Sequence, residues 1–375
     1  MKDKIKKIIY KFLPLKNRIV FESNPEFSCN ALPVYEEMVK RGIREKYEIY
    51  WLVENKDKYK EDASGNKYLN YVEHGFGIIH KWYILATSKA LIFTNRIINK
   101  HKENQFVINL MHGCPLKMTW GYVEHDTCDY VISLANTFNS VISKQLDVPM
   151  KKIVSLGFPR NDVFQNNYQS LTRMGFEGNE KMIVWMPTFR KNKNSNVSYG
   201  DVREFGVPLL DSIEKFNEIN NILKQNKVVL VIKLHPAEDT KQMTIENYSN
   251  IVFISDLELN AKFLTAYKLL ADSDAMITDY SSVYYDYLLT NKPIGLVIDD
   301  LNEYSNKNGF WYGEYKSFIK GQYIETYDEF ISFVIDLANG VDSSQKEREI
   351  ARNRYCQYQD YNATKRVVDF IMNKL

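Results

Sequence analysis

The chain has 375 residues, 45% of them hydrophobic, which is enough for two domains with full apolar cores. Its formal net charge of +2 argues against a protein that binds nucleic acid through bulk charge. Four scattered cysteines without a CxxC pair predict a reducing compartment and no structural zinc, and the lack of a run of about 18 apolar residues predicts no membrane span.

A basic amphipathic helix is predicted over residues 1–17. Its lysines face a single acid, Asp3, and five apolar residues share one helix face: Ile5, Ile8, Ile9, Phe12 and Leu13. Pro14 ends the pattern. The segment is too short and too charged for a signal peptide. Two interpretations remain open: a helix on an anionic membrane surface, or a helix packed on its own domain with the lysines in water.

Strand and helix patterns alternate over residues 18–165, which predicts a doubly wound α/β domain. The expected strands are Arg18–Ser23, Tyr47–Val53, Tyr68–Tyr71, Ala90–Thr94, Phe106–Leu110, Tyr130–Ser133 and Ile153–Leu156. The expected helices are Ala31–Arg41, Phe76–Ser88 and one between the last two strands.

The alternation restarts after a polar linker and predicts a second α/β domain over residues 166–342. Its expected strands are Met182–Met186, Val228–Leu234, Ile251–Ile254, Ala275–Ile277 and Ile294–Ile298. Its expected helices are Ser212–Lys224, Ala261–Ala271 and one that starts near Val283. Residues 343–375 are predicted to form a helical tail. Two such halves predict two Rossmann-type domains that face a ligand cleft.

Polar segments follow five of the predicted strands. They are Met111–Lys117, Gly157–Asp162, Pro187–Arg190, His235–Pro236 and Asp279–Ser282. The carboxyl ends of parallel strands share one edge of a sheet, beside the ligand crevice, so we expect these segments to converge on one cleft. In the last segment Ser281 or Ser282 can cap the following helix, and a helix N-terminus suits a phosphate group.

In this order the segments resemble motifs of the CDP-glycerol glycerophosphotransferase family of teichoic-acid and capsule synthesis. They read HGCPLK, GFPRND, PTFR, KLHP and DYSSVYYD, and FESNPEFSCN resembles the family's opening segment. Cys114 stands where the family usually has threonine, and Met111 where a tryptophan often precedes the histidine. The resemblance covers about residues 21–293. It implies a GT-B-like fold and transfer of a polyol phosphate from a CDP-activated donor.

His112 is the expected general base. The acceptor hydroxyl must lose its proton as it attacks the β-phosphorus of the donor, and a histidine with a pKa of about 6.5 is largely neutral at pH 7. The leaving CMP needs its charge neutralised more than it needs a proton. His235 is the second catalytic candidate, and the donor pyrophosphate is expected to bind Arg190, Ser281 and Ser282.

Four further residues are expected to support the site: Asp279, Arg160, Lys117 and Asp286. Asp279 could orient His235 or a serine, and Asp286 could favour the first turn of its helix. For Arg160 the alternative is an ion pair with Asp162, and for Lys117 a solvated helix position. No metal site and no cofactor are expected, because the nearby acids are spread over a helix end and a strand.

The leading hypothesis is a peripheral enzyme at the cytoplasmic face of a membrane. It would pass glycerol phosphate or ribitol phosphate to a lipid-linked saccharide or a growing polymer. Its expected partners are the CDP-polyol donor, that acceptor and an anionic membrane surface, with no nucleic acid. The alternatives are a GT-B sugar-nucleotide glycosyltransferase or epimerase, and a non-catalytic assembly protein with a relic cleft. The polyol, the acceptor, the number of units added, the oligomeric state and the help of a divalent ion stay open.

Overall fold

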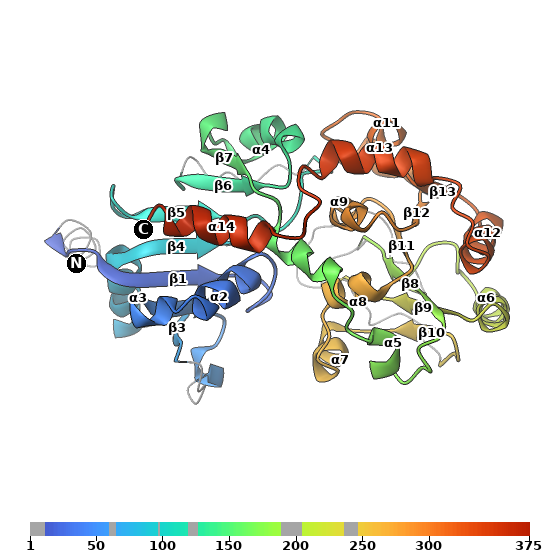
Figure 1. The fold of residues 1–375 in the computed structure, drawn as a ribbon, viewed down its shortest axis with the longest axis horizontal. Coiled ribbons are helices and arrows are strands. Elements are labelled where there is room, and N and C mark those ends of the chain that lie inside the picture. Colours follow the sequence, from blue (N-terminus) through green and yellow to red (C-terminus); the bar gives the residue numbers. More distant parts are fainter. Residues whose placement is uncertain (1–11, 60–64, 97, 119–126, 189–204, 236–246) are drawn as a thin grey trace. The chain divides into compact units, whose positions relative to one another are not determined.

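The computed structural model describes residues 12–59, 65–96, 98–118, 127–188, 205–235 and 247–375. The chain forms two compact units (Figure 1). Unit 1 comprises Met1–Cys114, Trp120–Asp162 and Gln357–Leu375, and unit 2 comprises Pro115–Thr119 and Val163–Cys356. Most of the predicted basic helix, residues 1–11, lies outside the described residues.

Unit 1 is built on a seven-stranded parallel sheet in the order β3-β2-β1-β4-β5-β6-β7. The strands are β1 (Lys16–Glu22), β2 (Glu48–Val53), β3 (Lys67–Asn70), β4 (Ser88–Phe93), β5 (Phe106–Asn109), β6 (Tyr130–Ser133) and β7 (Ile153–Ser155). The helices are α2 (Ala31–Lys40), α3 (Phe76–Thr87), α4 (Asn139–Leu146) and α14 (Ala363–Met372). Apolar runs such as Ile19-Val20-Phe21 are fully buried, as expected for strands that helices cover on both faces. The order of strands reverses between β1 and β4, where a doubly wound sheet binds ligands at its carboxyl edge.

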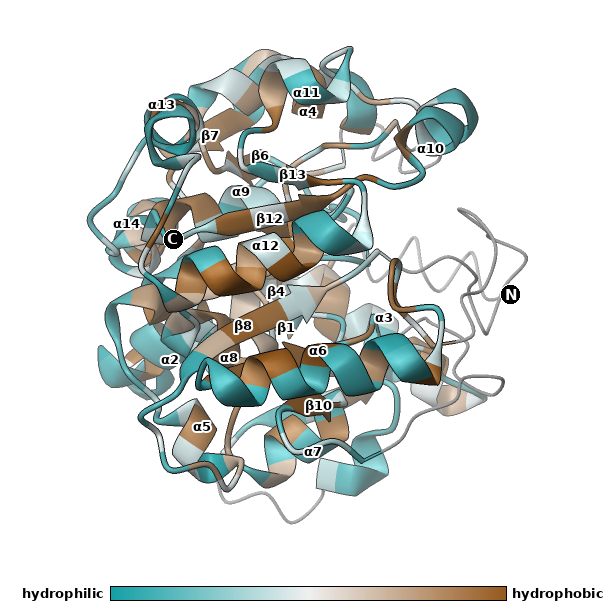
Figure 2. Ribbon diagram, turned by 90° about the vertical axis from the view of Figure 1, so that its right-hand side faces the viewer, coloured by the Kyte–Doolittle hydropathy of each residue, from teal (hydrophilic) through white to brown (hydrophobic). Residues whose placement is uncertain are grey.

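Unit 2 repeats this architecture with a six-stranded parallel sheet in the order β10-β9-β8-β11-β12-β13. The strands are β8 (Lys181–Met186), β9 (Val228–Ile232), β10 (Ile251–Phe253), β11 (Ala275–Thr278), β12 (Ile294–Val297) and β13 (Gln322–Ile324). The helices are α5 (Ser170–Arg173), α6 (Ile213–Gln225), α7 (Asp256–Ala261), α8 (Ala266–Asp272), α9 (Val283–Tyr287), α10 (Leu301–Asn308), α11 (Tyr315–Phe318), α12 (Tyr327–Ala338) and α13 (Gln345–Tyr355). Figure 2 shows α6 and α12 over one face of this sheet, where both bury apolar side chains in its core. The reversal of strand order falls between β8 and β11.

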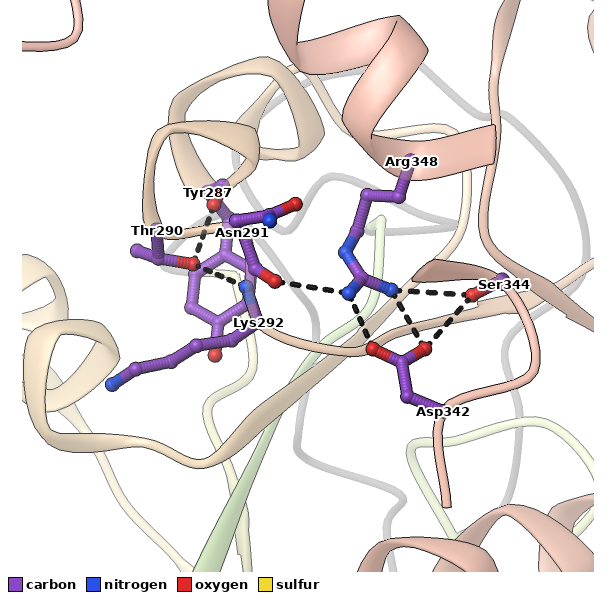
Figure 3. A network of polar contacts seen from close by, with 7 residues as sticks. All are labelled: Tyr287, Thr290, Asn291, Lys292, Asp342, Ser344 and Arg348. Carbon is purple, nitrogen blue, oxygen red and sulfur yellow. Dashed lines mark hydrogen bonds and ion pairs between the residues drawn. The ribbon is translucent and has the colours of Figure 1, made fainter. Parts of the chain in front are cut away.

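The predicted helical tail is shared between the two units instead of forming a region of its own. Helix α13 belongs to unit 2 and α14 to unit 1. Arg348 on α13 is 1% exposed and anchors this helix. Its guanidinium donates to Asp342 Oδ1 at 2.9 Å and to the backbone oxygen of Asn291 at 2.9 Å (Figure 3). On α14, Val367, Val368 and Ile371 are fully buried in unit 1.

The prediction of a single helix over Ala261–Ala271 is wrong. Helix α7 ends at Ala261 and α8 begins at Ala266. Between them Phe263 has a left-handed backbone with φ of 59°, which helices do not continue through. Thr265 then starts α8 by accepting a hydrogen bond from the backbone nitrogen of Lys268 at 3.2 Å.

Candidate active site

His112 lies on a loop that follows β5, and its backbone is held on both sides. The preceding residue, Met111, has a left-handed φ of 54°, which costs a side-chain-bearing residue about 1 kcal/mol. Its N–H donates to Asn109 Oδ1 at 2.7 Å, and its carbonyl accepts from Asn30 Nδ2 at 3.0 Å. The carbonyl of His112 accepts from Arg160 Nη1 at 2.6 Å. These bonds offset the strain and fix the position from which the imidazole extends.

Asn30 joins three segments that are far apart in the sequence. It is fully buried and precedes α2. Besides Met111, its amide nitrogen donates to the carbonyl of Leu110 at 2.8 Å, and its amide oxygen accepts from the backbone nitrogen of Arg160 at 3.1 Å. The Arg160 guanidinium also donates to Cys29 Sγ at 3.1 Å. The opening segment, the His112 loop and the Arg160 turn therefore form one hydrogen-bonded cluster within unit 1.

The imidazole of His112 is suited to accept a proton. Its Nδ1 lies 3.4 Å from the carbonyl oxygen of Thr94. The residue as a whole is exposed to solvent, although the protein around the ring desolvates it in part. This desolvation, followed by the charge of Arg160, lowers the pKa of His112 from 6.5, and the hydrogen bond to Thr94 opposes the shift. A lowered pKa keeps the ring neutral near pH 7, as a general base requires.

Arg160 and Asp162 serve different partners. Arg160 is 6% exposed and is committed to the His112 loop. The carboxylate of Asp162 accepts hydrogen bonds from the backbone nitrogens of Ala363 at 3.0 Å and Thr364 at 2.7 Å, so it caps α14. The two residues of this motif thus hold the His112 loop and the last helix of unit 1, respectively.

In unit 2, Asp279 lies at the carboxyl edge between β8 and β11. It is 1% exposed, and its Oδ1 accepts from the backbone nitrogen of Thr188 at 2.8 Å and from Thr188 Oγ1 at 2.6 Å. Its carbonyl accepts from the hydroxyl of Tyr315 at 2.6 Å. Asp279 therefore joins the ends of the two strands where the strand order reverses.

Ser281 and Ser282 follow Asp279 and are both partly exposed. Ser281 Oγ accepts a long hydrogen bond of 3.4 Å from the backbone nitrogen of Val283. Ser282 is the N-cap residue of α9 but makes no side-chain cap bond. Asp286 lies in the first turn of α9, is 1% exposed and accepts from the hydroxyl of Tyr267 at 2.9 Å. Because α9 has five residues, its dipole alone gives weak support to a phosphate.

The remaining predicted residues lie elsewhere in unit 2 or outside the described residues. His235 follows β9 and is exposed, whereas Arg190 lies outside the described ranges. Lys117, which we assigned to the first domain, groups with unit 2, because it forms an isolated antiparallel bridge with Phe310.

Sequence reasoning gave no role to several buried polar residues at these strand ends. Among them are Glu22, Asn30, Thr188 and Lys233. Lys233 is 3% exposed, and its ammonium lies 3.1 Å from Asp256 Oδ2 and 3.0 Å from the carbonyl of Leu234, one residue before His235. Its position as a charged residue at the end of the apolar run VVLVIK could have marked Lys233 as a candidate for the site.

Among the residues that the structure describes, no group of three or more His, Cys, Asp or Glu side chains could hold a metal ion. Within the same residues, no helix combines the length and the apolar character needed to cross a membrane.

The chain is similar to known proteins over almost its whole length. The sequence model of the family "CDP-Glycerol:Poly(glycerophosphate) glycerophosphotransferase" matches residues 6–373. The chain is 25% identical to a teichoic acid poly(glycerol phosphate) polymerase of Bacillus spizizenii, over 98% of the chain and 96% of the relative. It is also 25% identical to a teichoic acid poly(ribitol-phosphate) polymerase of that organism, over 87% of the chain but only 52% of the relative.

Among solved structures, a variant of the wall teichoic acid polymerase TagF superposes with a TM-score of 0.76 and 21% identity, covering 99% of this chain and 93% of that chain. The likeness confirms the GT-B-like α/β fold that the sequence predicts.

Proposed function

The chain belongs to the CDP-glycerol:poly(glycerophosphate) glycerophosphotransferase family, and we propose that it transfers glycerol phosphate or ribitol phosphate from a CDP-activated donor to an acceptor hydroxyl, with release of CMP. The observation that carries the proposal is the family match over residues 6–373, and it is supported by the hydrogen bonds that hold the backbone of His112. The acceptor is a lipid-linked saccharide or a growing polymer of the teichoic-acid or capsule type.

His112 takes the proton of the acceptor hydroxyl. The hydroxyl oxygen bonds to the β-phosphorus of the donor, and the bond from that phosphorus to the bridging oxygen breaks. The electron pair of the broken bond leaves with CMP, which is stable as an anion and needs no proton from the enzyme. The lowered pKa of His112 supports this role, because most of the enzyme then holds an unprotonated base at pH 7.

The donor pyrophosphate binds at the carboxyl edge of the unit 2 sheet. It carries about two negative charges, whereas a helix N-terminus offers about half a positive charge. We assign the remaining neutralisation to Arg190 and His235, with Ser281 and Ser282 as neutral donors. Asp279 is assigned a positioning role, since its carboxylate already accepts from Thr188 and like charges repel.

The enzyme works as a peripheral protein at the cytoplasmic face of the membrane. Supporting this, four lysines and only two acids line a hollow at the amino-terminal edge of the unit 1 sheet, beside the starts of β5 and β6. The lysines are Lys100, Lys151, Lys152 and Lys374, and the acids are Glu103 and Asp129, which pairs with Lys100. Nearby, Lys102 donates to the carbonyl of Leu13, so the described end of the basic N-terminal segment lies at this edge. An anionic lipid surface attracts such a cluster.

A donor panel tests the proposal. The purified protein is incubated with a lipid-linked disaccharide and CDP-glycerol, CDP-ribitol or UDP-N-acetylglucosamine, and nucleotide release is measured. We expect CMP from one CDP-polyol and no UDP. Absence of CMP with both CDP-polyols, or stabilisation by UDP but not by CDP in a thermal-shift assay, would contradict the proposal. The length of the product separates single addition from polymerisation.

A further inference from the structure

Glu22 is a buried carboxylate for which the function has given no role. It is the last residue of β1, at the point where the strand order reverses, and it is fully buried. Its Oε1 accepts from the hydroxyl of Tyr71 at 2.7 Å. Its Oε2 accepts from the backbone nitrogens of Thr94 at 3.0 Å and Asn95 at 3.1 Å. Three donors in a buried place are what an ionised carboxylate needs.

One peptide unit connects Glu22 to His112. The N–H of Asn95 and the carbonyl of Thr94 belong to the same peptide group. Its N–H end donates to Glu22 at 3.1 Å, and its carbonyl end lies 3.4 Å from His112 Nδ1. Hydrogen bonds at the two ends of a peptide polarise each other, so the carboxylate makes this carbonyl a stronger acceptor.

The contact to Thr94 also determines the tautomer of the imidazole. A carbonyl oxygen only accepts hydrogen bonds. A neutral His112 that bonds to it therefore carries its proton on Nδ1 and leaves Nε2 unprotonated. The described charged groups near this arrangement include the guanidinium of Arg160, which donates to the carbonyl of His112. They also include the guanidinium of Arg96, 3.8 Å from the centre of the Tyr71 ring, and the carboxylate of Glu54, which pairs with Arg96 and raises the pKa of Tyr71. Burial and Glu22 raise the pKa of Tyr71, so its phenol stays a donor.

We propose that Glu22 is a positioning residue for His112 and acts through the Thr94–Asn95 peptide. Its carboxylate selects the imidazole tautomer protonated on Nδ1, and it stabilises the imidazolium that forms when Nε2 takes the proton of the acceptor hydroxyl. The arrangement is a carboxylate–histidine pair with a peptide group inserted between the partners. The catalytic consequence rests on the proposed function, whereas the tautomer does not.

The alternative is that Glu22 only holds the end of β4, and the variants are chosen to distinguish the two. Glu22→Gln keeps the size and an acceptor oxygen but removes the charge. Asp272→Asn is the matched control, because Asp272 also accepts two backbone N–H groups and one hydroxyl: from Tyr168 at 2.9 Å, from Ser170 at 2.8 Å and from Ser170 Oγ at 2.5 Å. It is the last residue of α8 and precedes β11, so it lies at the edge of the unit 2 sheet opposite the edge that carries Asp279.

The experiment records ¹⁵N spectra of the histidine side chains in the full-length protein without donor, with the signals of His112 assigned from a His112→Gln variant. We expect the Nδ1–H tautomer in the native protein, and a weaker preference for it with a lower His112 pKa in Glu22→Gln. In the CMP-release assay kcat should fall on the order of tenfold in Glu22→Gln, with KM for the donor unchanged. Asp272→Asn should change neither the spectrum nor kcat.

Two results would overturn the inference: a native His112 protonated on Nε2, or a Glu22→Gln variant with native tautomer and kcat. Should Glu22→Gln fail to fold, the native spectrum still decides. Absence of CMP release from the native protein, with the expected tautomer, would refute the proposed function and leave the assignment of the tautomer standing.

Discussion

Replacing Asn30 by alanine removes the residue that joins the opening segment, the His112 loop and the Arg160 turn. The fully buried amide makes three hydrogen bonds, two to carbonyls and one from a backbone nitrogen. At about 1 kcal/mol for each bond, we expect the variant to lose about 3 kcal/mol of unfolding free energy. Met111 loses the donor that helps to hold its left-handed backbone, so His112 shifts. A displacement of about 1 Å lowers kcat on the order of 10²-fold.

Gln105 provides a closely matched control. It is 1% exposed, donates to the carbonyls of Leu85 at 2.7 Å and Ser88 at 2.6 Å, and accepts from the backbone nitrogen of His101 at 2.9 Å. Gln105→Ala therefore removes the same set of bonds at the other edge of the same sheet. Urea unfolding and CMP release are measured on both variants. Equal losses of stability with native kcat in both would refute the reasoning that Asn30 positions the base.

Three further predictions concern His112, the anchoring of α13 by Arg348, and the basic N-terminal segment. Because the pKa of His112 is lowered, kcat/KM should rise with pH through a midpoint below 6.5, and a midpoint above 6.5 would contradict the role of His112 as the base. His112→Ala should lower kcat on the order of 10²- to 10⁴-fold. Arg348→Ala leaves Asp342 without the guanidinium that it pairs with and should cost about 3 kcal/mol by chemical denaturation, against under about 1 kcal/mol for Lys316→Ala in the exposed pair with Glu325. Deleting residues 1–14 should shift the protein off anionic vesicles in a sedimentation assay, and unchanged binding would favour a helix packed on its own domain.

The fold could be predicted because its strands are dense apolar runs between polar breaks. The predicted strands Arg18–Ser23 and Val228–Leu234 correspond to β1 and β9 to within two residues at each end. Strand β13 went unpredicted, because a run of three residues, Gln322–Ile324, carries no period. The break between α7 and α8 depends on a left-handed backbone at Phe263, and the residue type at this position does not predict that conformation.

The motifs of the candidate site could be predicted from the sequence, but the buried residues that hold His112 in position could not. His112 stands in a segment whose residue types suggest chemistry. Glu22 and Asn30 stand in the opening segment FESNPEFSCN, which resembles that of the family, but their roles could not be assigned, because their partners lie about 70 to 130 residues away along the chain. Periodicity reports which face of an element is buried, and it carries no information on which distant backbone groups a buried amide or carboxylate will meet.

The return of α14 to unit 1 bears on how the protein folds while it is being synthesised. Unit 2 is inserted between Asp162 and Gln357, so the ribosome completes it before the last helix of unit 1 exists. The chain is synthesised at about 5–20 residues per second. The apolar side chains of α14 therefore become available on the order of tens of seconds after the rest of unit 1. The domain begun first is thus closed last. Its uncovered apolar surface is where we expect nascent chains to need a chaperone.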